Sequence, residues 1–289
     1  MNERYTRQSF LGPKSKEIIK HCRVCIIGLG GGGSHLVQQL AHIGIGEFLI
    51  FDADHVEDSN LNRLVGATQA DVAAKTPKTV VATRLIQGIN PNALIIARPQ
   101  KWQESAAMLR DADVVFGCVD SFSERHQIEG TARRYLIPYI DIGMDVHDLG
   151  SQFAISGQVI LSMPGELCMK CMGFLRDDLL AREAANYGAA GSKPQVIWPN
   201  GVLASFAVGI FVQLMTPWHK DHRRVWYLEY DGNSQTVATS NRLAHLSGVV
   251  CNHFSALEDL GEPFWKPTDL GTEQTSDGQA LGKSAEAKT

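Results

Sequence analysis

A glycine-rich segment near the N-terminus has the composition of a phosphate-binding loop. The run 24–27 is short and apolar, as in a buried strand, and residues 34–43 that follow the glycines have the apolar spacing of a helix. A strand, a glycine turn and a helix N-terminus together present free backbone N–H groups and the positive end of a helix dipole. The segment therefore predicts an anion site, lined by Gly28, Gly30, Gly31 and Gly33.

A carboxylate lies where a nucleotide-binding fold would place one. Asp52 ends the next apolar run, 48–51, and lies 24 residues after Gly28. In dinucleotide-binding folds this is the position of the carboxylate that binds the ribose. The glycine pattern alone is weak evidence, but with Asp52 it predicts a nucleotide site.

Polar and cationic residues follow Asp52 in two separate loops. Asn60 and Arg63 lie eight and eleven residues beyond it, and Lys78 follows in the sequence KTPK, near the start of a predicted helix. Cations around a glycine loop suit a triphosphate, because the leaving pyrophosphate needs its charge neutralised. The alternative is that Arg63 and Lys78 are solvated surface charges. We favour the shared site, since two independent loops bring cations toward it.

A second carboxylate, Asp120, ends the apolar run DADVVFGCVD. The C-terminal end of a central parallel strand borders the crevice where open α/β sheets bind ligands. Asp120 is therefore a candidate to hold Mg²⁺ on the phosphates. It could equally be the N-cap of a helix that begins at Ser121, because Asp is a favoured cap. The two roles are compatible.

The elements that must position these residues alternate between strand and helix. Such alternation predicts βαβ units and a mostly parallel, Rossmann-like α/β sheet with helices on both faces. Antiparallel additions are expected in the C-terminal half, from the alternating run 152–161 and a hairpin at 225–239. The predicted strands are 24–27, 47–51, 93–97, 113–118 and 137–142, and the predicted helices are 34–44, 77–89, 103–110, 123–135 and the buried 202–215.

Composition limits the classes of protein that need to be considered. The chain has 289 residues, of which 44% are hydrophobic and 20% charged, so it can bury a sizeable core. A net charge of -4 argues against binding nucleic acid by bulk electrostatics. The first ten residues do not resemble a signal peptide, and the apolar run 202–215 is too short to span a bilayer. Six cysteines do not suggest a disulfide framework, which favours a reducing cytoplasm. Together these features lead us to expect a cytoplasmic protein without membrane contact.

The motifs occur together in the order and spacing of one known family. RYTRQ, GLGGGG, FDADHVEDSNLNR, TPK, DVVFGCVDSFSER, GQV and CMKC resemble those of the ThiF/MoeB/HesA family, over about residues 3–254. This is the fold of bacterial sulfur-carrier adenylyltransferases and of the adenylation half of ubiquitin-activating enzymes. The resemblance implies a ThiF-type adenylation domain at 23–265. The residues themselves predict a helical arm at 1–22 with Ile18 and Ile19 facing inward, and the polar, small residues after Pro267 predict a disordered tail at 266–289.

The resemblance also implies an activity. A ThiF-like enzyme uses ATP and Mg²⁺ to adenylate the C-terminal carboxylate of a small ubiquitin-like or sulfur-carrier protein ending in Gly-Gly, and releases pyrophosphate. A homodimer is implied, and a conjugating enzyme is a possible further partner. Within the family the substrate could instead be a peptide or the carboxylate of a modified tRNA base. From other classes, an NAD-dependent oxidoreductase and a catalytically silent scaffold remain as alternatives.

Individual residues match the family's site. Asp52 matches the ribose ligand and Asn60 a nucleotide contact, Arg63 and Lys78 match the phosphate-binding cations, and Asp120 matches the Mg²⁺-associated aspartate. Arg7, the second arginine of RYTRQ, matches an arginine that reaches across the dimer into the partner's ATP site. The chain departs from the family at Ser121, where Asn is usual, and in a slightly longer loop before Lys78.

The cysteines suggest a zinc site and no thioester. Cys168 and Cys171 resemble half of the family's structural zinc site, and Cys251 with His253 stands where a second C-x-x-C is usual. Three sulfurs and an imidazole complete a tetrahedral site. Cys22, Cys25 and Cys118 are expected to be packing residues. We therefore predict that the enzyme stops at the acyl-adenylate, as MoeB-like members do, without transferring the acyl group to its own cysteine.

Overall fold

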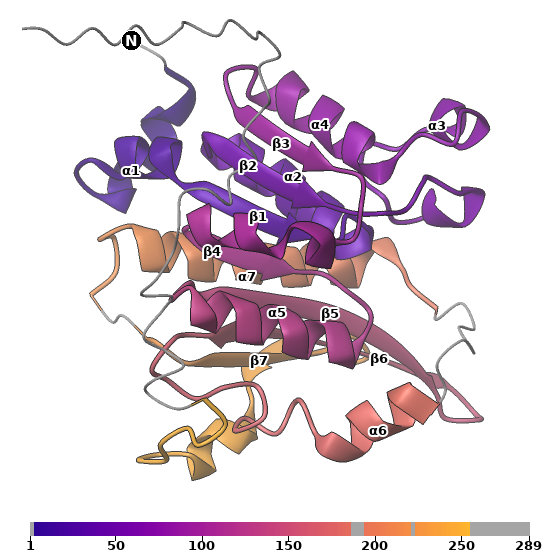
Figure 1. Ribbon diagram of the computed structural model, residues 1–289, viewed down its shortest axis with the longest axis vertical. Coiled ribbons are helices and arrows are strands. Elements are labelled where there is room, and N and C mark those ends of the chain that lie inside the picture. The colour runs from indigo at the N-terminus through magenta and orange to yellow at the C-terminus, as the bar shows by residue number, and fades with distance from the viewer. Residues whose placement is uncertain (1–2, 186–193, 221–222, 255–289) are drawn as a thin grey trace, which may run out of the picture.

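The computed structural model describes residues 3–185, 194–220 and 223–254. The tail predicted at 266–289 and the domain boundary at 265 lie outside these residues. The described residues form one sheet with helices packed against it (Figure 1).

The sheet has eight strands in the order β3-β2-β1-β4-β5-β6-β7-β8. Strands β3, β2, β1, β4 and β5 are parallel, and β5 to β8 are joined by antiparallel pairing. The predicted mostly parallel sheet with antiparallel additions is thus confirmed. The strands are β1 Arg23–Ile27, β2 Glu47–Phe51, β3 Leu94–Arg98, β4 Val114–Gly117, β5 Tyr139–Asp148, β6 Phe153–Ser162, β7 Trp226–Asp231 and β8 Thr236–Thr239.

Helices cover both faces of the sheet, as predicted. Alternate residues of β1 point to opposite faces, so Val24 packs in one core with α2 and α7, and Cys25 in the other with α5. In Figure 1, α5 lies in front of the sheet and α7 behind it. The helices are η1 Glu3–Leu11, α1 Ser15–His21, α2 Gly31–Ile43, η2 Asp58–Asn60, α3 Gln69–Ala73, α4 Lys78–Ile89, η3 Trp102–Asp111, α5 Phe122–Arg134, α6 Asp177–Ala185, α7 Ile197–Met215 and η4 Asn241–His245.

Strand β5 is longer than its apolar run predicted. The prediction ended at 142, but residues 143–148 continue to pair with β6 after the pairing with β4 has ended at Asp141. These six residues are half-buried or exposed, so they lack the apolar signal of a core strand. Their pairing with β6 keeps them extended, and sequence periodicity alone does not register such pairing.

Helix α7 begins at Ile197, five residues before the predicted start at Val202. The helix is therefore long and apolar enough to cross a membrane by length and composition, and the argument that the run is too short was wrong. A core helix of a soluble protein passes the same test, and α7 packs against α2 and against strands β5 and β6. Leu203, Ala207 and Phe211 are fully buried in that contact.

The N-terminal arm is helical, but only one of its two isoleucines faces inward. Ile19 is 2% exposed, whereas Ile18 is 36% exposed, which corrects the prediction for Ile18. Ile19 lies on the same face of α1 as the buried Ser15, four residues earlier, while Ile18 is turned about 100° away from that face. Two further elements differ in detail. Segment 102–111 is a 3-10 helix with a kink at Ser105, and α2 begins at Gly31, before the predicted Ser34.

Candidate active site

The glycine loop connects β1 to α2 at the C-terminal ends of the central strands. Gly28 has a φ of 86°, and a Cβ there would lie 2.7 Å from the Cys118 carbonyl oxygen. Only glycine fits this turn without strain. The Gly28 N–H donates to the Phe51 carbonyl at 2.9 Å, which ties the loop to β2. The N-terminus of α2, with Gly30 as its N-cap, therefore opens beside the ends of β1, β2 and β4.

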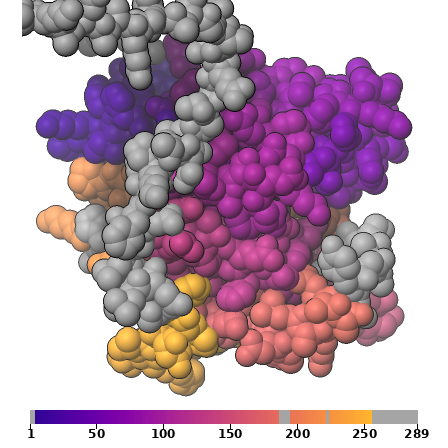
Figure 2. Space-filling view, viewed as in Figure 1, coloured from indigo at the N-terminus to yellow at the C-terminus, as the bar shows by residue number. Residues whose placement is uncertain are grey.

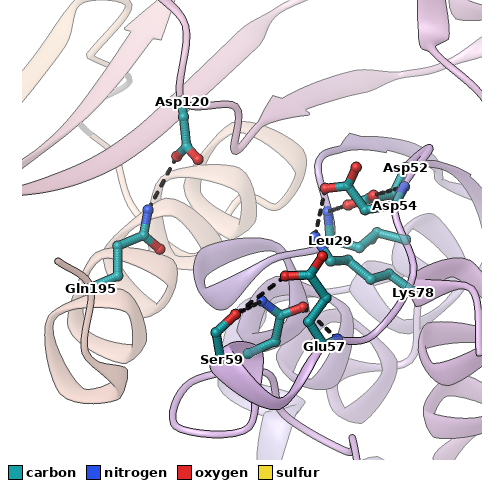
Figure 3. Close-up of polar contacts among 9 residues, drawn as sticks. Leu29, Asp52, Asp54, Glu57, Ser59, Lys78, Asp120 and Gln195 are labelled. Carbon is teal, nitrogen blue, oxygen red and sulfur yellow. Dashed lines mark hydrogen bonds and ion pairs between the residues drawn. The ribbon is translucent and has the colours of Figure 1, made fainter. Parts of the chain in front are cut away.

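Asp52 lies directly against this loop. Its Oδ2 accepts the N–H of Leu29 at 2.7 Å, and its Oδ1 accepts the N–H of Asp54 at 2.8 Å (Figure 3). Burial raises the pKa of the Asp52 carboxyl, and the nearby Lys78 charge together with the two N–H groups partly offsets that rise. The carboxylate predicted to bind ribose is thus at the glycine loop and half-buried.

Lys78 is the first residue of α4 and lies beside Asp52. Its Nζ is 2.8 Å from Oδ2 of Asp54, and its backbone N–H donates to the Asp54 carbonyl at 3.0 Å. The Lys78 side chain is 11% exposed, while that of Asp54 is 72% exposed. The lysine is therefore a largely buried cation held next to the loop, as the sequence predicted. Its partner Asp54 was not predicted, because its position three residues past a strand end is common for a solvated carboxylate.

Asn60 and Arg63 lie in the loop that follows, turned toward their own segment. Oδ1 of the buried Asn60 accepts the Glu57 N–H at 3.1 Å and closes a capping box around η2. Nη1 of Arg63 donates to the Ser59 carbonyl at 2.7 Å and to Oδ1 of Asn62 at 2.9 Å. These side-chain hydrogen bonds of Asn60 and Arg63 therefore stay within residues 57–63, and their contacts with a nucleotide stay a prediction.

Asp120 is exposed three residues after the end of β4. Its Oδ1 accepts a hydrogen bond from Nε2 of Gln195 at 3.3 Å, and the Gln195 carbonyl accepts Nδ2 of Asn62 at 3.1 Å. A chain of hydrogen bonds thus links Asp120 through Gln195 and Asn62 to Arg63. Figure 3 shows Asp120 and Gln195 on one side of the site, and the group of Asp52, Asp54 and Lys78 on the other.

The first turn of α5 shows that Asp120 is not its N-cap. Ser121 has that position, and its Oγ accepts the Glu124 N–H at 3.1 Å. Glu183 of α6 also binds this end of α5, accepting the N–H groups of Phe122 at 3.1 Å and Ser123 at 2.7 Å. The helix N-terminus is already satisfied by these groups, so the Asp120 carboxylate remains available for a cation. Figure 2 shows α6 on the surface of this face.

Arg7 lies away from its own chain's glycine loop. It is an exposed residue of η1, and η1 packs at the opposite end of α2, where a Cβ on Gly44 would lie 2.8 Å from the Tyr5 ring. Gly44 is the C-cap of α2, and a helix of that length spans about 20 Å. Arg7 therefore does not join Asp52 and Lys78 within one chain, and its role in a partner's site stays a prediction.

Three sulfur ligands and one nitrogen ligand lie close together near α5. Cys168, Cys171, Cys251 and His253 have their ligand atoms within 4.8 Å of one another. Nδ1 of His253 is 3.5 Å from the Cys168 sulfur and 3.2 Å from the Cys171 sulfur. Ligands about 2.3 Å from a tetrahedral zinc ion are separated by roughly 3.5–4 Å, so these residues suit zinc in number and type and lie close to the spacing that it requires. The structure brings together all four predicted ligands, including His253.

Helix α5 supports the loop that carries this cluster. Glu129 is fully buried, and its Oε1 accepts the Met169 N–H at 2.8 Å and the Ser162 hydroxyl at 2.6 Å. Arg133, also fully buried, donates Nε to Ser162 at 3.1 Å and Nη2 to the Glu166 carbonyl at 3.0 Å. The loop between β6 and α6 is thereby fixed to α5, so the first two cysteines have a rigid support.

The three remaining cysteines have thiols of low reactivity. Burial raises the pKa of the Cys22 thiol to about 12, with Asp113 adding to the effect. Burial also raises the pKa of Cys25 and of Cys118 well above the usual value. Cys118 had been predicted to lie within the strand 113–118. In the structure it follows the last residue of β4. All three thus stay protonated near neutral pH, as expected for packing residues.

Comparison with known proteins places these features in a family. The profile of the ThiF family matches residues 3–247. A sulfur carrier protein adenylyltransferase of Thermus thermophilus is 31% identical over 181 residues, which cover 59% of this chain and 63% of that protein. A SAMP-activating enzyme E1 of Haloferax volcanii is 29% identical over 175 residues, covering 59% of this chain and 61% of the relative. The chain thus spans about three-fifths of the length of these relatives.

Solved structures show the same fold at low sequence identity. The microcin C7 biosynthetic enzyme MccB, in complex with N-formylated MccA, superposes with a TM-score of 0.69 at 22% identity. That match covers 83% of this chain and 72% of MccB. PaaA superposes with a TM-score of 0.65 at 21% identity, with 82% of each chain covered.

Proposed function

Because the chain belongs to the ThiF family, we propose that it adenylates the C-terminal carboxylate of a small ubiquitin-like or sulfur-carrier protein. The observation that carries the proposal is the array at the strand ends. The glycine loop, Asp52 and Lys78 lie together, and the exposed Asp120 is linked to Arg63 through hydrogen bonds. An oxidoreductase using the same loop would leave Asp120 and Arg63 without a shared purpose.

The reaction needs positioning and charge neutralisation more than covalent chemistry from the protein. A carboxylate oxygen of the carrier attacks the α-phosphorus of ATP, the bond to the bridging oxygen breaks, and pyrophosphate leaves with both electrons. The N–H groups of the glycine loop and the α2 N-terminus hold phosphate oxygens. Asp52 accepts the ribose hydroxyls, and Lys78 and Arg63 offset the charge of the leaving group.

Asp120 is the residue that would hold Mg²⁺. Mg²⁺ held there would supply positive charge beside the phosphates, which would stabilise the leaving pyrophosphate. An exposed carboxylate that shares the site with phosphates suits Mg²⁺, which uses one or two carboxylates and keeps several waters. Nε2 of Gln195 donates to Oδ1 of Asp120 at 3.3 Å, so only one of the two carboxylate oxygens is engaged by this glutamine.

The carrier is the proposed substrate because several relatives are named for acting on such proteins. One is the sulfur carrier protein adenylyltransferase of Thermus thermophilus, and another is the sulfur carrier protein ThiS adenylyltransferase of Bacillus subtilis, 29% identical over 178 residues. A peptide substrate is the second candidate, favoured by the likeness of the fold to MccB, whose structure contains MccA. A cytoplasmic location and a homodimer complete the proposal.

Exchange of labelled pyrophosphate into ATP tests the proposal. We expect exchange in the presence of Mg²⁺ and a Gly-Gly-ended carrier, and none with the same carrier lacking its last two glycines. The truncated carrier keeps its folded surface, so it serves as the matched control for the reacting carboxylate. Exchange driven only by a free peptide would favour the second candidate. Titration with NADH should show no change in nicotinamide fluorescence, and a saturable change would favour an oxidoreductase.

We also propose that the reaction on this chain ends at the acyl-adenylate. The thiols of Cys22, Cys25 and Cys118 are held protonated by burial, and the other three cysteines form the cluster with His253. A thiol nucleophile must be a thiolate and accessible. After incubation of enzyme, ATP and carrier, non-reducing denaturing gels should show no thiol-sensitive enzyme–carrier band. A band that disappears when one of these cysteines is replaced by Ala would overturn this conclusion and identify the nucleophile.

A further inference from the structure

A buried arginine binds the backbone immediately before Asp120. Arg125 lies one turn into α5, with its side chain 8% exposed. Its Nε donates to the Val119 carbonyl oxygen at 3.0 Å, and its Nη2 donates to the same oxygen at 2.7 Å. That carbonyl belongs to the peptide bond that joins Val119 to Asp120. The guanidinium thus binds this peptide group through two charge-assisted hydrogen bonds.

The arginine is itself fixed by a carboxylate of the sheet. Nη1 of Arg125 is 3.1 Å from Oδ2 of Asp141, a fully buried residue of β5. The other oxygen of Asp141 accepts the Tyr139 hydroxyl at 2.8 Å. With its amide oriented to satisfy both of its groups, Gln158 of β6 accepts a hydrogen bond from Nη1 of Arg125 at 2.6 Å and donates to the Gly143 carbonyl at 3.1 Å. Asp141 therefore has a donor at each of its two oxygens, one from α5 and one from its own strand, and these fix its orientation.

A glycine and two aromatic rings surround the guanidinium. A Cβ on Gly143 would collide with the guanidinium nitrogens of Arg125, so the absence of a side chain there creates its space. A glycine within a strand often marks such a close approach. The rings of Phe122 and Phe174 flank the guanidinium, with centroids 6.0 Å and 5.5 Å from its central carbon. These contacts orient the side chain from several directions.

Regular secondary structure does not hold the backbone at this point. Strand β4 ends at Gly117 and α5 begins at Phe122, so residues 118–121 lie between elements. A buried ion pair is weak evidence of stabilisation, since apolar residues of the same volume often serve as well. An apolar side chain could not bind the Val119 carbonyl. The placement of the pair therefore fits a requirement for fixed geometry at the next residue.

We propose that Arg125, oriented by Asp141, is the positioning residue for Asp120. The pair fixes the Val119–Asp120 peptide, so that the Asp120 carboxylate meets Mg²⁺ on the bound nucleotide in one geometry. This inference rests on the proposed function, in which Asp120 holds the ion. Arg125 has no contact with the reacting atoms and acts through Asp120 alone.

Arg125→Lys is the central test, with Arg133→Lys as its matched control. Lysine keeps the charge but lacks the forked donors that bind a carbonyl and a carboxylate together. We expect Arg125→Lys to lose about tenfold to a hundredfold in carrier-dependent exchange, because a small misplacement of a positioned group costs that much. Arg133→Lys disturbs an equally buried arginine of the same helix and should leave the dependence of exchange on Mg²⁺ unchanged. Circular dichroism and Tm establish that each variant is folded.

A double-variant cycle separates positioning from general stability. If Arg125 acts through Asp120, Arg125→Lys will cause no further loss in an Asp120→Ala background. Independent, multiplicative losses would overturn the proposal, as would wild-type exchange and Mg²⁺ dependence in a folded Arg125→Lys protein. If Arg125→Lys fails to fold, Tyr139→Phe takes its place as the test. This change removes one hydrogen bond to Asp141 and keeps the packing, so it should alter the Mg²⁺ dependence of pyrophosphate exchange slightly.

Hydrogen exchange gives a measurement that does not depend on activity. Backbone amides of 118–123 should exchange faster in Arg125→Lys than in the wild type, and at the wild-type rate in Arg133→Lys. Unchanged exchange of this segment in Arg125→Lys would contradict the positioning role even if the protein proves to act on another substrate. Absence of carrier adenylation by the wild type would instead refute the proposed function and leave this measurement valid.

Discussion

Helix α5 carries two buried arginines, and they serve different parts of the molecule. Arg125 pairs with Asp141 of β5 at 3.1 Å, while Arg133 lies 3.9 Å from Glu129 of its own helix. Burial raises the pKa of both carboxyls. The largest opposing influence on Asp141 is the charge of Arg125, whereas for Glu129 it is the hydrogen bond from Ser162, with Arg133 contributing less.

The difference shows two ways in which one helix can fix a loop. At the N-terminal end, a charge pair between helix and sheet holds the backbone beside an exposed carboxylate. Further along the helix, Glu129 accepts the Met169 N–H directly. The Ser162 hydroxyl connects Glu129 to Arg133, so neutral groups make much of the connection between α5 and the loop that contains Cys168 and Cys171. We therefore expect changes at the first end to affect the reaction, and changes at the second end to affect stability.

Replacing Asp120 should give the largest effect and no loss of folding. Asp120→Ala removes the ligand proposed for Mg²⁺ and should cost on the order of a hundredfold or more in exchange rate. Asp178→Ala, which removes an exposed carboxylate of α6, is the control and should change little. Full activity in Asp120→Ala would contradict the expectation that the N-terminal end of α5 serves the reaction and the other end serves stability.

Removal of the metal should have a larger effect on the stability of the protein than on its affinity for nucleotide. We expect one zinc per chain, and chelation should lower Tm by several degrees, since a loss of 1 kcal/mol moves Tm by roughly 2–4 °C in a domain of this size. Affinity for ATP should change little. Cys171→Ala should reproduce the low Tm and make it insensitive to chelator. Protein prepared without chelator that contains no zinc would refute the site.

Arg7 tests whether the site is complete within one chain. Arg7→Ala should fold normally and lose about tenfold in exchange rate if the arginine neutralises phosphate charge in a partner's site. Mixed with Asp120→Ala protein after subunit exchange, it should recover about a quarter of wild-type activity, because half of the dimers then contain one complete site. No recovery after verified exchange would place Arg7 outside the reaction.

The sequence predicted what depends on local pattern, and missed what depends on pairing across the fold. The glycine loop and Asp52 were confirmed as neighbours, because a strand end and a helix start are encoded within a few residues. The partner of Arg125 was not predicted, since Asp141 lies in an apolar strand and nothing nearby marks it as one half of an ion pair. Gly143 within β5 was the available signal.

Caps and strand ends were also decided by distant contacts. Asp120 and Ser121 are both good caps, and the choice between them depends on backbone angles that sequence does not specify. Gln195 reaches Asp120 from a segment 75 residues away. Such contacts require the tertiary structure. His253, in contrast, was predicted because metal ligands follow chemical type, and four suitable side chains were available.

The pH dependence of nucleotide affinity should give the smallest effect. Burial raises the pKa of Asp52, so its folded form binds a proton more tightly than an ordinary aspartate does. The carboxylate accepts the ribose hydroxyls, and affinity should therefore fall as the pH decreases through this raised pKa. At higher pH the group is ionised and affinity should be constant. Calorimetric titration across mildly acidic pH measures this, and Asp52→Asn should flatten the profile at low affinity.

The space that Gly143 leaves for Arg125 has a consequence for how sequences with this fold diverge. A Cβ at 143 would lie against both terminal nitrogens of the Arg125 guanidinium, so a side chain there requires the guanidinium to leave its present position. The two positions should therefore change together during evolution, and single substitutions at 143 should be tolerated only after the arginine has been lost. Among related chains, larger residues at position 143 should accompany small or apolar residues at position 125, which records the contact in sequence variation.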